Sequence, residues 1–188
     1  MRRFLGVALL LGSSVAAAQR FSQYTDLVQL AVDGDRLFFL RRNGNILLEE
    51  GGRLSVYDSG TGTKQIAIDR GTCYALKDNG NVWRRVERGS WEKIDAGTGT
   101  KELFAKSGGV YVLKTNGNIW AYDGAWSKID EGTGTRQIVV DRQGGVYALK
   151  DNGNIWQYTG SWRKIDDGEG TRQIAVSRGM VYALKDNG

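Results

Sequence analysis

Residues 110–138 read VYVLKTNGNIWAYDGAWSKIDEGTGTRQI, and residues 146–174 read VYALKDNGNIWQYTGSWRKIDDGEGTRQI. The same pattern recurs more loosely along the rest of the chain, and its clearest marker is an Asn-Gly pair. The pairs are Asn43-Gly44, Asn79-Gly80, Asn116-Gly117, Asn152-Gly153 and Asn187-Gly188. They are 36, 37, 36 and 35 residues apart. A fixed period of this length is typical of repeat architectures, in which each unit is one supersecondary element.

The unit that begins at Thr135 predicts four short antiparallel strands. Residues 136–143 and 146–150 alternate apolar and polar side chains, and two glycines separate them. The Asn152-Gly153 turn leads to a third strand over 154–158, and a second glycine turn leads to a fourth over 162–166. Asn-Gly between alternating hydrophobic segments favours a two-residue type I′ hairpin, which needs positive φ at both central residues.

Four strands per unit of about 36 residues predict an all-β fold, a β-propeller with one four-stranded blade per repeat. A β-solenoid has shorter coils, and an open sandwich would not repeat its sequence. The chain covers about four and a half blades, which we interpret as part of a five- or six-bladed ring. The last blade stops at Asn187-Gly188, apparently truncated before its third strand, and residues 19–23 align with a fourth strand. We therefore expect the N-terminus to complete the last blade, or the open edge to favour oligomers.

The first 18 residues lie outside the repeats and have the features of a secretory signal peptide. Arg2 and Arg3 give a basic start, residues 4–11 are mostly apolar, and Ala16-Ala17-Ala18 offers a cleavage site. A short membrane anchor or a buried strand is the alternative. The predicted organisation is a signal peptide over 1–18 and a propeller domain over 19–188, with a secreted or periplasmic product and no membrane span.

The composition argues against several functional classes. The mature chain has 24 basic and 21 acidic residues, a net charge of +3, which is too small for a nucleic-acid interface. Histidine is absent, so neither an imidazole base nor the usual transition-metal ligand sets are available, and we expect no enzyme and no cofactor. Cys73 is the only cysteine and occupies the position of valine in later repeats, which favours a core role.

The motif V-Y-A-L-K-D-N-G-N-I-W-x-Y-x-G-x-W-x-K-I-D resembles the tectonin (tachylectin-like) repeat, and the resemblance covers 21–188. It implies a β-propeller with repeats of this length and a secreted protein that recognises bacterial or fungal glycans. The first blade departs from the pattern, since Leu47 and Leu54 replace its two tryptophans. Any site in that blade is therefore in doubt.

Three groups of residues recur at positions where a sugar could bind. In an up-and-down blade the Asn-Gly turn and the loop to the next blade emerge on one rim, where carboxylates and amides can hydrogen-bond sugar hydroxyls. Tryptophans that open the fourth strand are the third group, because indoles stack on sugar rings. The candidate carbohydrate-binding residues are Asn79, Asn116, Asn152, Asp95, Asp130, Asp166, Trp91, Trp126 and Trp162.

Each group also has a structural interpretation. The Asp-x-Gly-x-Gly-Thr loops at Asp58, Asp95, Asp130 and Asp166 fit an Asx turn better than a Ca²⁺ site. Repeated tryptophans often fill the space between blades. The lysines before each turn, Lys77, Lys114, Lys150 and Lys185, could contact an anionic sugar or serve only solubility.

These features favour a multivalent lectin whose weak repeated sites gain strength through avidity. A propeller scaffold for a protein partner is the alternative. A metal-dependent propeller enzyme fits least well.

Overall fold

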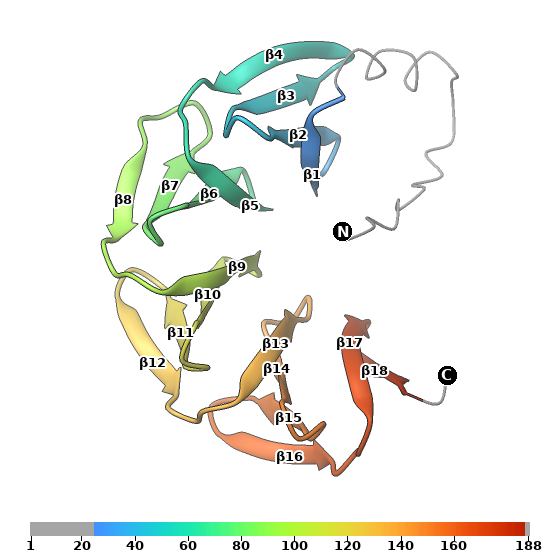
Figure 1. The fold of residues 1–188 in the computed structure, drawn as a ribbon. Coiled ribbons are helices and arrows are strands. Elements are labelled where there is room, and N and C mark those ends of the chain that lie inside the picture. The colour runs from blue at the N-terminus through green and yellow to red at the C-terminus, as the bar shows by residue number, and fades with distance from the viewer. Residues whose placement is uncertain (1–24, 187–188) are drawn as a thin grey trace.

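The structure, a computed structural model, describes residues 25–186 as five antiparallel β-sheets arranged in an arc (Figure 1). Blade 1 contains β1 (Leu27–Asp33), β2 (Arg36–Arg41), β3 (Ile46–Glu50) and β4 (Arg53–Asp58). Blade 2 contains β5 (Thr63–Asp69), β6 (Thr72–Lys77), β7 (Val82–Val86) and β8 (Glu92–Asp95). Blade 3 contains β9 (Thr100–Lys106), β10 (Gly109–Lys114), β11 (Ile119–Tyr122) and β12 (Trp126–Asp130). Blade 4 contains β13 (Thr135–Val140), β14 (Val146–Lys150), β15 (Ile155–Tyr158) and β16 (Trp162–Asp166), and the fifth sheet pairs β17 (Thr171–Ser177) with β18 (Met180–Lys185).

Within every blade the strands are paired in sequence order, and the first strand faces the common centre (Figure 1). The predicted all-β propeller with four complete blades and one half-blade is therefore confirmed. The signal peptide and the additional strand predicted over 19–23 lie outside the described residues. No helix in 25–186 is long and apolar enough to cross a membrane.

The hydrophobic core is divided into layers between successive blades, which explains the sequence of the second strands. In β14, Val146 and Ala148 pack in the layer between blades 3 and 4, whereas Tyr147 and Leu149 pack in the layer between blades 4 and 5. All four are at most 3% exposed. A strand buried on both faces must be almost continuously apolar, as VYALK is. Cys73 is fully buried between blades 1 and 2, which confirms its core role.

The Asn-Gly turns have a different geometry from the predicted type I′ hairpin. At the β6–β7 turn, the Gly80 N–H donates to the Lys77 carbonyl at 2.9 Å, and the Lys77 N–H donates to Asn81 O at 2.9 Å. Gly80 has a φ of 86°, but Asn79 is not among the residues with positive φ. The loop is therefore a three-residue type I turn closed by a glycine bulge, and the type I′ prediction is wrong here. Asn79 stabilises this turn by accepting a hydrogen bond from the Asn81 N–H at 3.1 Å.

Two-residue turns with positive φ at both positions join the first and second strands instead. They are Arg70-Gly71 (48° and 80°), Ser107-Gly108 (58° and 82°) and Arg178-Gly179 (51° and 76°). None of these pairs contains asparagine. In blades 2 and 3 and in the fifth sheet, this turn geometry therefore occurs at the first hairpin and not at the Asn-Gly hairpin.

At three of the four blade boundaries, a glutamine in the innermost strand joins one blade to the next. Its side-chain amide donates to the carbonyl and accepts from the N–H of one residue on the neighbouring inner strand, as a paired strand would. These pairs connect Gln29 to Ile66, Gln65 to Leu103 and Gln137 to Ile174, with distances between 2.7 and 3.0 Å. The equivalent residue in blade 3 is Glu102. Because a carboxylate cannot donate, the boundary between blades 3 and 4 lacks the full pair.

Candidate functional site

Two clefts with corresponding linings lie at successive blade boundaries, on the rim formed by the Asn-Gly turns and the loops between blades. The cleft of blade 3 is lined by Asp95, Gly97, Thr98, Gly99, Lys114, Thr115, Asn116, Asn118, Trp120 and Trp126. The cleft of blade 4 is lined by Asp130, Gly132, Thr133, Gly134, Lys150, Asp151, Asn152, Asn154, Trp156 and Trp162. Each has a volume of about 550 Å³. The ten positions correspond one to one, and only Thr115 and Asp151 differ in type.

The predicted sharing of one rim by the turn and the inter-blade loop is confirmed by direct contacts. The Asp151 N–H donates to Gly134 O at 2.7 Å, and the Thr115 N–H donates to Gly99 O at 2.7 Å. On its other side, the same loop packs against the turn of the preceding blade. A Cβ added to Gly117 would lie 2.9 Å from Gly134 N, so no larger residue fits there.

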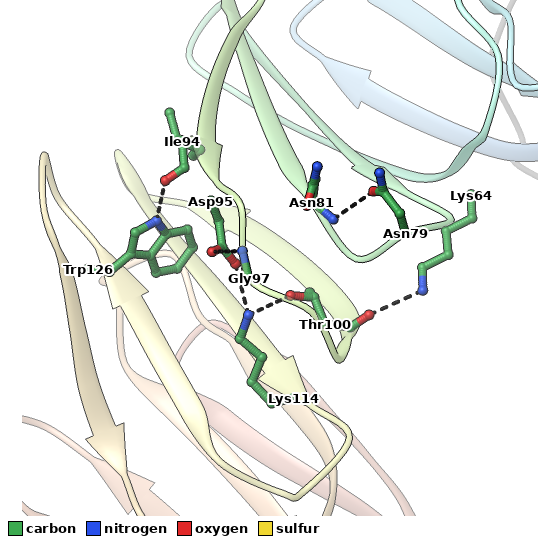
Figure 2. A network of polar contacts seen from close by, with 9 residues as sticks. All are labelled: Lys64, Asn79, Asn81, Ile94, Asp95, Gly97, Thr100, Lys114 and Trp126. Atoms are coloured by element: carbon green, nitrogen blue, oxygen red, sulfur yellow. Dashed lines mark hydrogen bonds and ion pairs between the residues drawn. The ribbon is translucent and has the colours of Figure 1, made fainter.

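The fourth-strand tryptophans are held in place by the preceding blade. Trp126 Nε1 donates to Ile94 O at 2.7 Å, as Figure 2 shows, and Trp162 Nε1 donates to Ile129 O at 2.6 Å. Trp126 also packs against Tyr122 at 5.1 Å between ring centroids. These indoles therefore join neighbouring blades, as the packing interpretation predicted, and at the same time form part of the cleft surface.

The third-strand tryptophans Trp120 and Trp156 also line the clefts, although the sequence analysis favoured the fourth-strand set. Their side chains are partly buried and make no hydrogen bond within residues 25–186. Lys128 Nζ lies 5.7 Å from the Trp120 ring centroid, a cation–π contact. The signal that could have identified these residues is the alternation in β11, which places Trp120 on the opposite face from Ala121.

The aspartates at the start of each inter-blade loop serve the fold. Asp95 accepts from the Gly97 N–H at 2.7 Å and from Lys114 Nζ at 2.8 Å, and Lys114 also donates to the Thr100 hydroxyl at 2.7 Å (Figure 2). Asp130 makes the same Asx turn with Gly132 and the same ion pair with Lys150, at 2.6 Å. This confirms the Asx-turn interpretation for Asp95 and Asp130. It also gives Lys114 and Lys150 a role that neither sequence interpretation proposed, since each neutralises a neighbouring carboxylate.

The asparagines of the turns use only part of their hydrogen-bonding capacity within the fold. Asn116 and Asn152 each accept a backbone hydrogen bond through Oδ1 at 3.1 Å, from Asn118 and Asn154 respectively. Their Nδ2 groups, and the side-chain amides of Asn118 and Asn154, make no hydrogen bond within the described part of the chain. These amides are therefore available to a ligand in the cleft.

Three of the predicted site residues lie at boundaries with different contacts. Trp91 Nε1 donates to Asp58 Oδ1 at 3.2 Å, and Lys77 bonds to Thr61 O and the Thr63 hydroxyl instead of Asp58. Trp91 and Asn79 thus belong to a boundary that lacks the Asp–Lys pair of the later blades. Asp166 pairs with Lys185 at 3.0 Å, at the boundary between blade 4 and the two-stranded fifth sheet.

No cluster of three or more potential metal ligands occurs in residues 25–186. Within the clefts, the Asp–Lys pairs leave little free charge apart from Asp151. The surface offered to a ligand consists of indole rings, amides and threonine hydroxyls. Such a surface can stack on a ring and hydrogen-bond hydroxyl groups.

Comparison with known proteins identifies the fold and no family. No protein-family model matches the sequence, and no curated protein is similar to it. Among solved structures, YCF48 bound to D1 peptide is similar with a TM-score of 0.62 and 16% identity, covering 82% of this chain and 59% of that one. The nidogen/laminin complex gives 0.61 and 12%, covering 85% and 72%, and Prp20p from Saccharomyces cerevisiae gives 0.57 and 14%, covering 73% and 46%. The chain spans about half the length of the first structures it resembles, 47% and 59%.

Proposed function

We propose that this protein is a multivalent carbohydrate-binding protein of the tectonin type, with one site in each complete inter-blade cleft. The observation that carries the proposal is the repetition of the same ten-residue lining at two boundaries. The fold itself needs the Asp–Lys pair and the glycines of this lining. It also uses Trp126 and Trp162 to join blades. Within residues 25–186, however, it makes no hydrogen bond to the indoles of Trp120 and Trp156 or to the side-chain amides of Asn118 and Asn154.

The chemistry of the cleft suits a neutral sugar. Its volume of about 550 Å³ lies within the roughly 300–1,000 Å³ typical of small-molecule sites. Indole faces provide apolar contact for the C–H surface of a pyranose, and the amides of Asn116 and Asn118 can donate to and accept from its hydroxyls. Because Lys114 is paired with Asp95, it offers less attraction to an acidic sugar than an isolated lysine would.

Two equivalent sites on one rigid arc favour avidity on a repetitive surface. When one cleft is occupied, the other samples a high effective concentration of ligand, so two weak sites produce a much stronger attachment. We propose that a secreted or periplasmic location, provided by the signal peptide predicted over 1–18, brings the protein to such a surface. An enzymatic role is not part of this proposal.

A protein-binding scaffold is the second candidate. It is favoured by the similarity to propellers solved with protein ligands, namely YCF48 with D1 peptide and nidogen with laminin. The two functions differ in their expected stoichiometry. A lectin has two equivalent sites, whereas a protein partner would contact a surface without internal repetition.

A glycan array probed with the mature protein tests the proposal. The informative variant is the double substitution W120L/W156L, because these two indoles make no hydrogen bond that the substitution would break. We expect loss of array binding in the double variant and weakened binding in each single variant. W83L, the equivalent change at the boundary with different contacts, is the matched control and should retain most of the binding.

A second variant pair separates binding from packing. T98A and T133A each remove one hydroxyl from a cleft, and neither hydroxyl has a partner in the described residues. Equal array binding by wild type, T98A/T133A and W120L/W156L would contradict the proposal, as would a blank array from a folded protein. Saturable binding of a protein ligand with a stoichiometry of one would then favour the scaffold.

A further inference from the structure

A cleft with a different lining lies at the boundary between blades 1 and 2. It has a volume of about 490 Å³, and β3 and β4 of blade 1 form one wall, which includes Glu50, Arg53 and Tyr57. Strand β7 of blade 2 and the turn after it contribute Arg85 and Arg88. Three arginines therefore line one cleft, and Glu50 is the only acidic residue among the described residues that line it.

The repeat does not account for these arginines. At the position of Arg85, blades 3 and 4 have Tyr122 and Tyr158, since all three residues pair with the equivalent residue of the second strand. Arg88 lies where blade 2 has two more residues between its third-strand and fourth-strand tryptophans than blade 3 has. Arg53 belongs to blade 1, whose sequence departs most from the pattern. The arginines of this cleft are therefore specific to one boundary.

The guanidinium of Arg85 is held in one orientation by its neighbours. Its Nη1 donates to Tyr57 O at 2.6 Å, and its Nε donates to Gly89 O at 2.7 Å. Its central carbon lies 4.4 Å from the Tyr57 ring centroid and 6.0 Å from that of Trp91, in cation–π contact. Both carbonyls are neutral, and Nη2 makes no hydrogen bond with any residue that the structure describes. Part of the guanidinium fork is therefore available to a ligand.

The positive charge of the cleft exceeds its negative charge. Arg53 and Arg85 make no ion pair within residues 25–186, and Glu50 pairs with Arg88 at 3.3 Å. That pair is open to solvent, with 87% of the Arg88 side chain and 44% of the Glu50 side chain exposed, so the attraction between them is weak. One carboxylate is set against three guanidinium groups. The potential in the cleft therefore favours an anion.

We propose that this cleft binds a small organic anion through Arg53, Arg85 and Arg88, with a carboxylate or a phosphate as the charged group of the ligand. A planar guanidinium can hold either group by two parallel hydrogen bonds. The volume of about 490 Å³ lies within the roughly 300–1,000 Å³ typical of small-molecule sites, so a body such as a sugar ring fits beside the charged group. The site is separate from the rim clefts and does not depend on their binding sugars.

An NMR titration of the ¹⁵N-labelled mature protein tests the site, because the indole N–H of Trp91 lies beside Arg85 and reports on it. The W91F variant assigns this signal. The probes are glucuronate, glucose 6-phosphate, glucose and inorganic phosphate, at low ionic strength. We expect both sugar anions to shift the Trp91 signal saturably, with an affinity that falls as NaCl is added because screening weakens exposed charge interactions. Glucose should not shift it.

The arms of the titration separate the sources of the charge. A shift with only one of the two sugar anions would identify the charged group as a carboxylate or as a phosphate. Inorganic phosphate should bind more weakly than the preferred sugar anion, because it leaves most of the cleft empty. The proposal would be overturned by the absence of a shift with both sugar anions, by an equal shift with glucose, or by equally tight binding of inorganic phosphate.

Variants locate the anion. R85Q should weaken the Kd for the sugar anion by about tenfold, the equivalent of one charge-assisted hydrogen bond. R53Q/R88Q should weaken it by about two- to fivefold, since these two side chains are exposed. R142Q removes an exposed arginine of blade 4 and is the matched control, with an unchanged Kd.

If R85Q fails to fold, R53Q/R88Q provides the test. An unchanged Kd in every folded variant of the cleft, or an equal loss in R142Q, would refute the site. W120L/W156L should bind the sugar anion normally at Trp91, so failure of the lectin proposal and failure of this one are distinguishable.

Discussion

Replacing Glu102 by glutamine should stabilise the protein at neutral pH. At three other blade boundaries a glutamine in this position makes two hydrogen bonds to the backbone of the next inner strand, for example Gln65 to Leu103 at 2.8 and 2.9 Å. E102Q would supply the missing donor at the boundary between blades 3 and 4. Each hydrogen bond contributes a net stability of about 0.5–1.5 kcal/mol, so two contribute about 1–3 kcal/mol. For a domain of this size, that corresponds to a rise in Tm of roughly 2–4 °C per kcal/mol.

The gain should depend on pH, because burial raises the pKa of the Glu102 carboxyl, opposed in part by the Lys101 ammonium. A carboxyl whose pKa is higher in the folded than in the unfolded state binds more protons when folded, so stability falls as pH rises. The contribution of protonated Glu102 is fully present below its unfolded pKa of about 4.3 and is lost as pH rises through the folded value. Protonated Glu102 can also donate a hydrogen bond as glutamine does. The advantage of E102Q should therefore be largest at pH 7 and shrink toward pH 4.

Urea unfolding followed by tryptophan fluorescence, at pH 4.5, 6 and 7.5, measures this difference. Q137E is the reverse change, made where the glutamine is hydrogen-bonded to Ile174. This variant should be less stable than wild type at pH 7.5. Q173E is the matched control, since Gln173 is exposed and makes no hydrogen bond within residues 25–186. An E102Q protein that is no more stable than wild type at pH 7.5 would refute the reasoning. So would an advantage that is the same at all three pH values.

Two further substitutions test how the rim is built. G117A should lower the free energy of unfolding by about 1–2 kcal/mol because of its positive φ, and by about 1–3 kcal/mol more because of the contact with Gly134. G51A, with a φ of 57° and open space around it, should show only the first loss. Equal losses of stability in thermal unfolding would rule out the packing argument. K150M should lower the free energy of unfolding by about 3 kcal/mol because it leaves the largely buried Asp130 carboxylate without its ion pair. K164M breaks the more exposed pair with Asp167 and should lower it by less than about 1 kcal/mol. Equal losses of stability in chemical denaturation would contradict the structural role of the Asp130–Lys150 pair.

The architecture could be predicted from the sequence because the repeat constrains it at many positions at once. The period places the hairpins, and VYALK, apolar on both faces, can only be a strand between two layers. The Asn-Gly turn was assigned wrongly because the dipeptide fits both a two-residue and a three-residue loop. The choice depends on the register of Lys77 and Asn81 across the hairpin. The turn glycine also lies against the inter-blade loop, since a Cβ on Gly80 would be 3.1 Å from Gly99 N. No local sequence pattern reveals that contact.

The candidate site was predicted in its location more than in its chemistry. Topology alone places Asn116 and Asp95 on one rim, and the structure confirms it. The pairing of Asp95 with Lys114 was missed because the two residues belong to different blades and are 19 positions apart. The role of the third-strand tryptophans was missed for a related reason, since which face of β11 lines a cleft depends on how adjacent blades stack. The glutamine pairs carried a visible signal, the recurrence of Gln at 29, 65, 137 and 173, but a polar residue in a repeat has many possible roles.

The clefts combine two kinds of residue, and this division determines how any binding experiment must be interpreted. Asp130, Lys150 and Gly134 are bonded to one another or packed so closely that changing them alters the fold first and the cleft second. The Thr133 hydroxyl and the Asn154 side-chain amide make no hydrogen bond within residues 25–186, so we expect their replacement to leave the fold intact. Structural need alone would leave the second kind of residue free to differ between the clefts, whereas recent duplication or selection for binding would keep it the same. Thr98 matches Thr133 and Asn118 matches Asn154, so the agreement extends to positions that the fold leaves unconstrained. Binding at these positions is therefore the property that separates a lectin from a propeller with repeated but unused grooves.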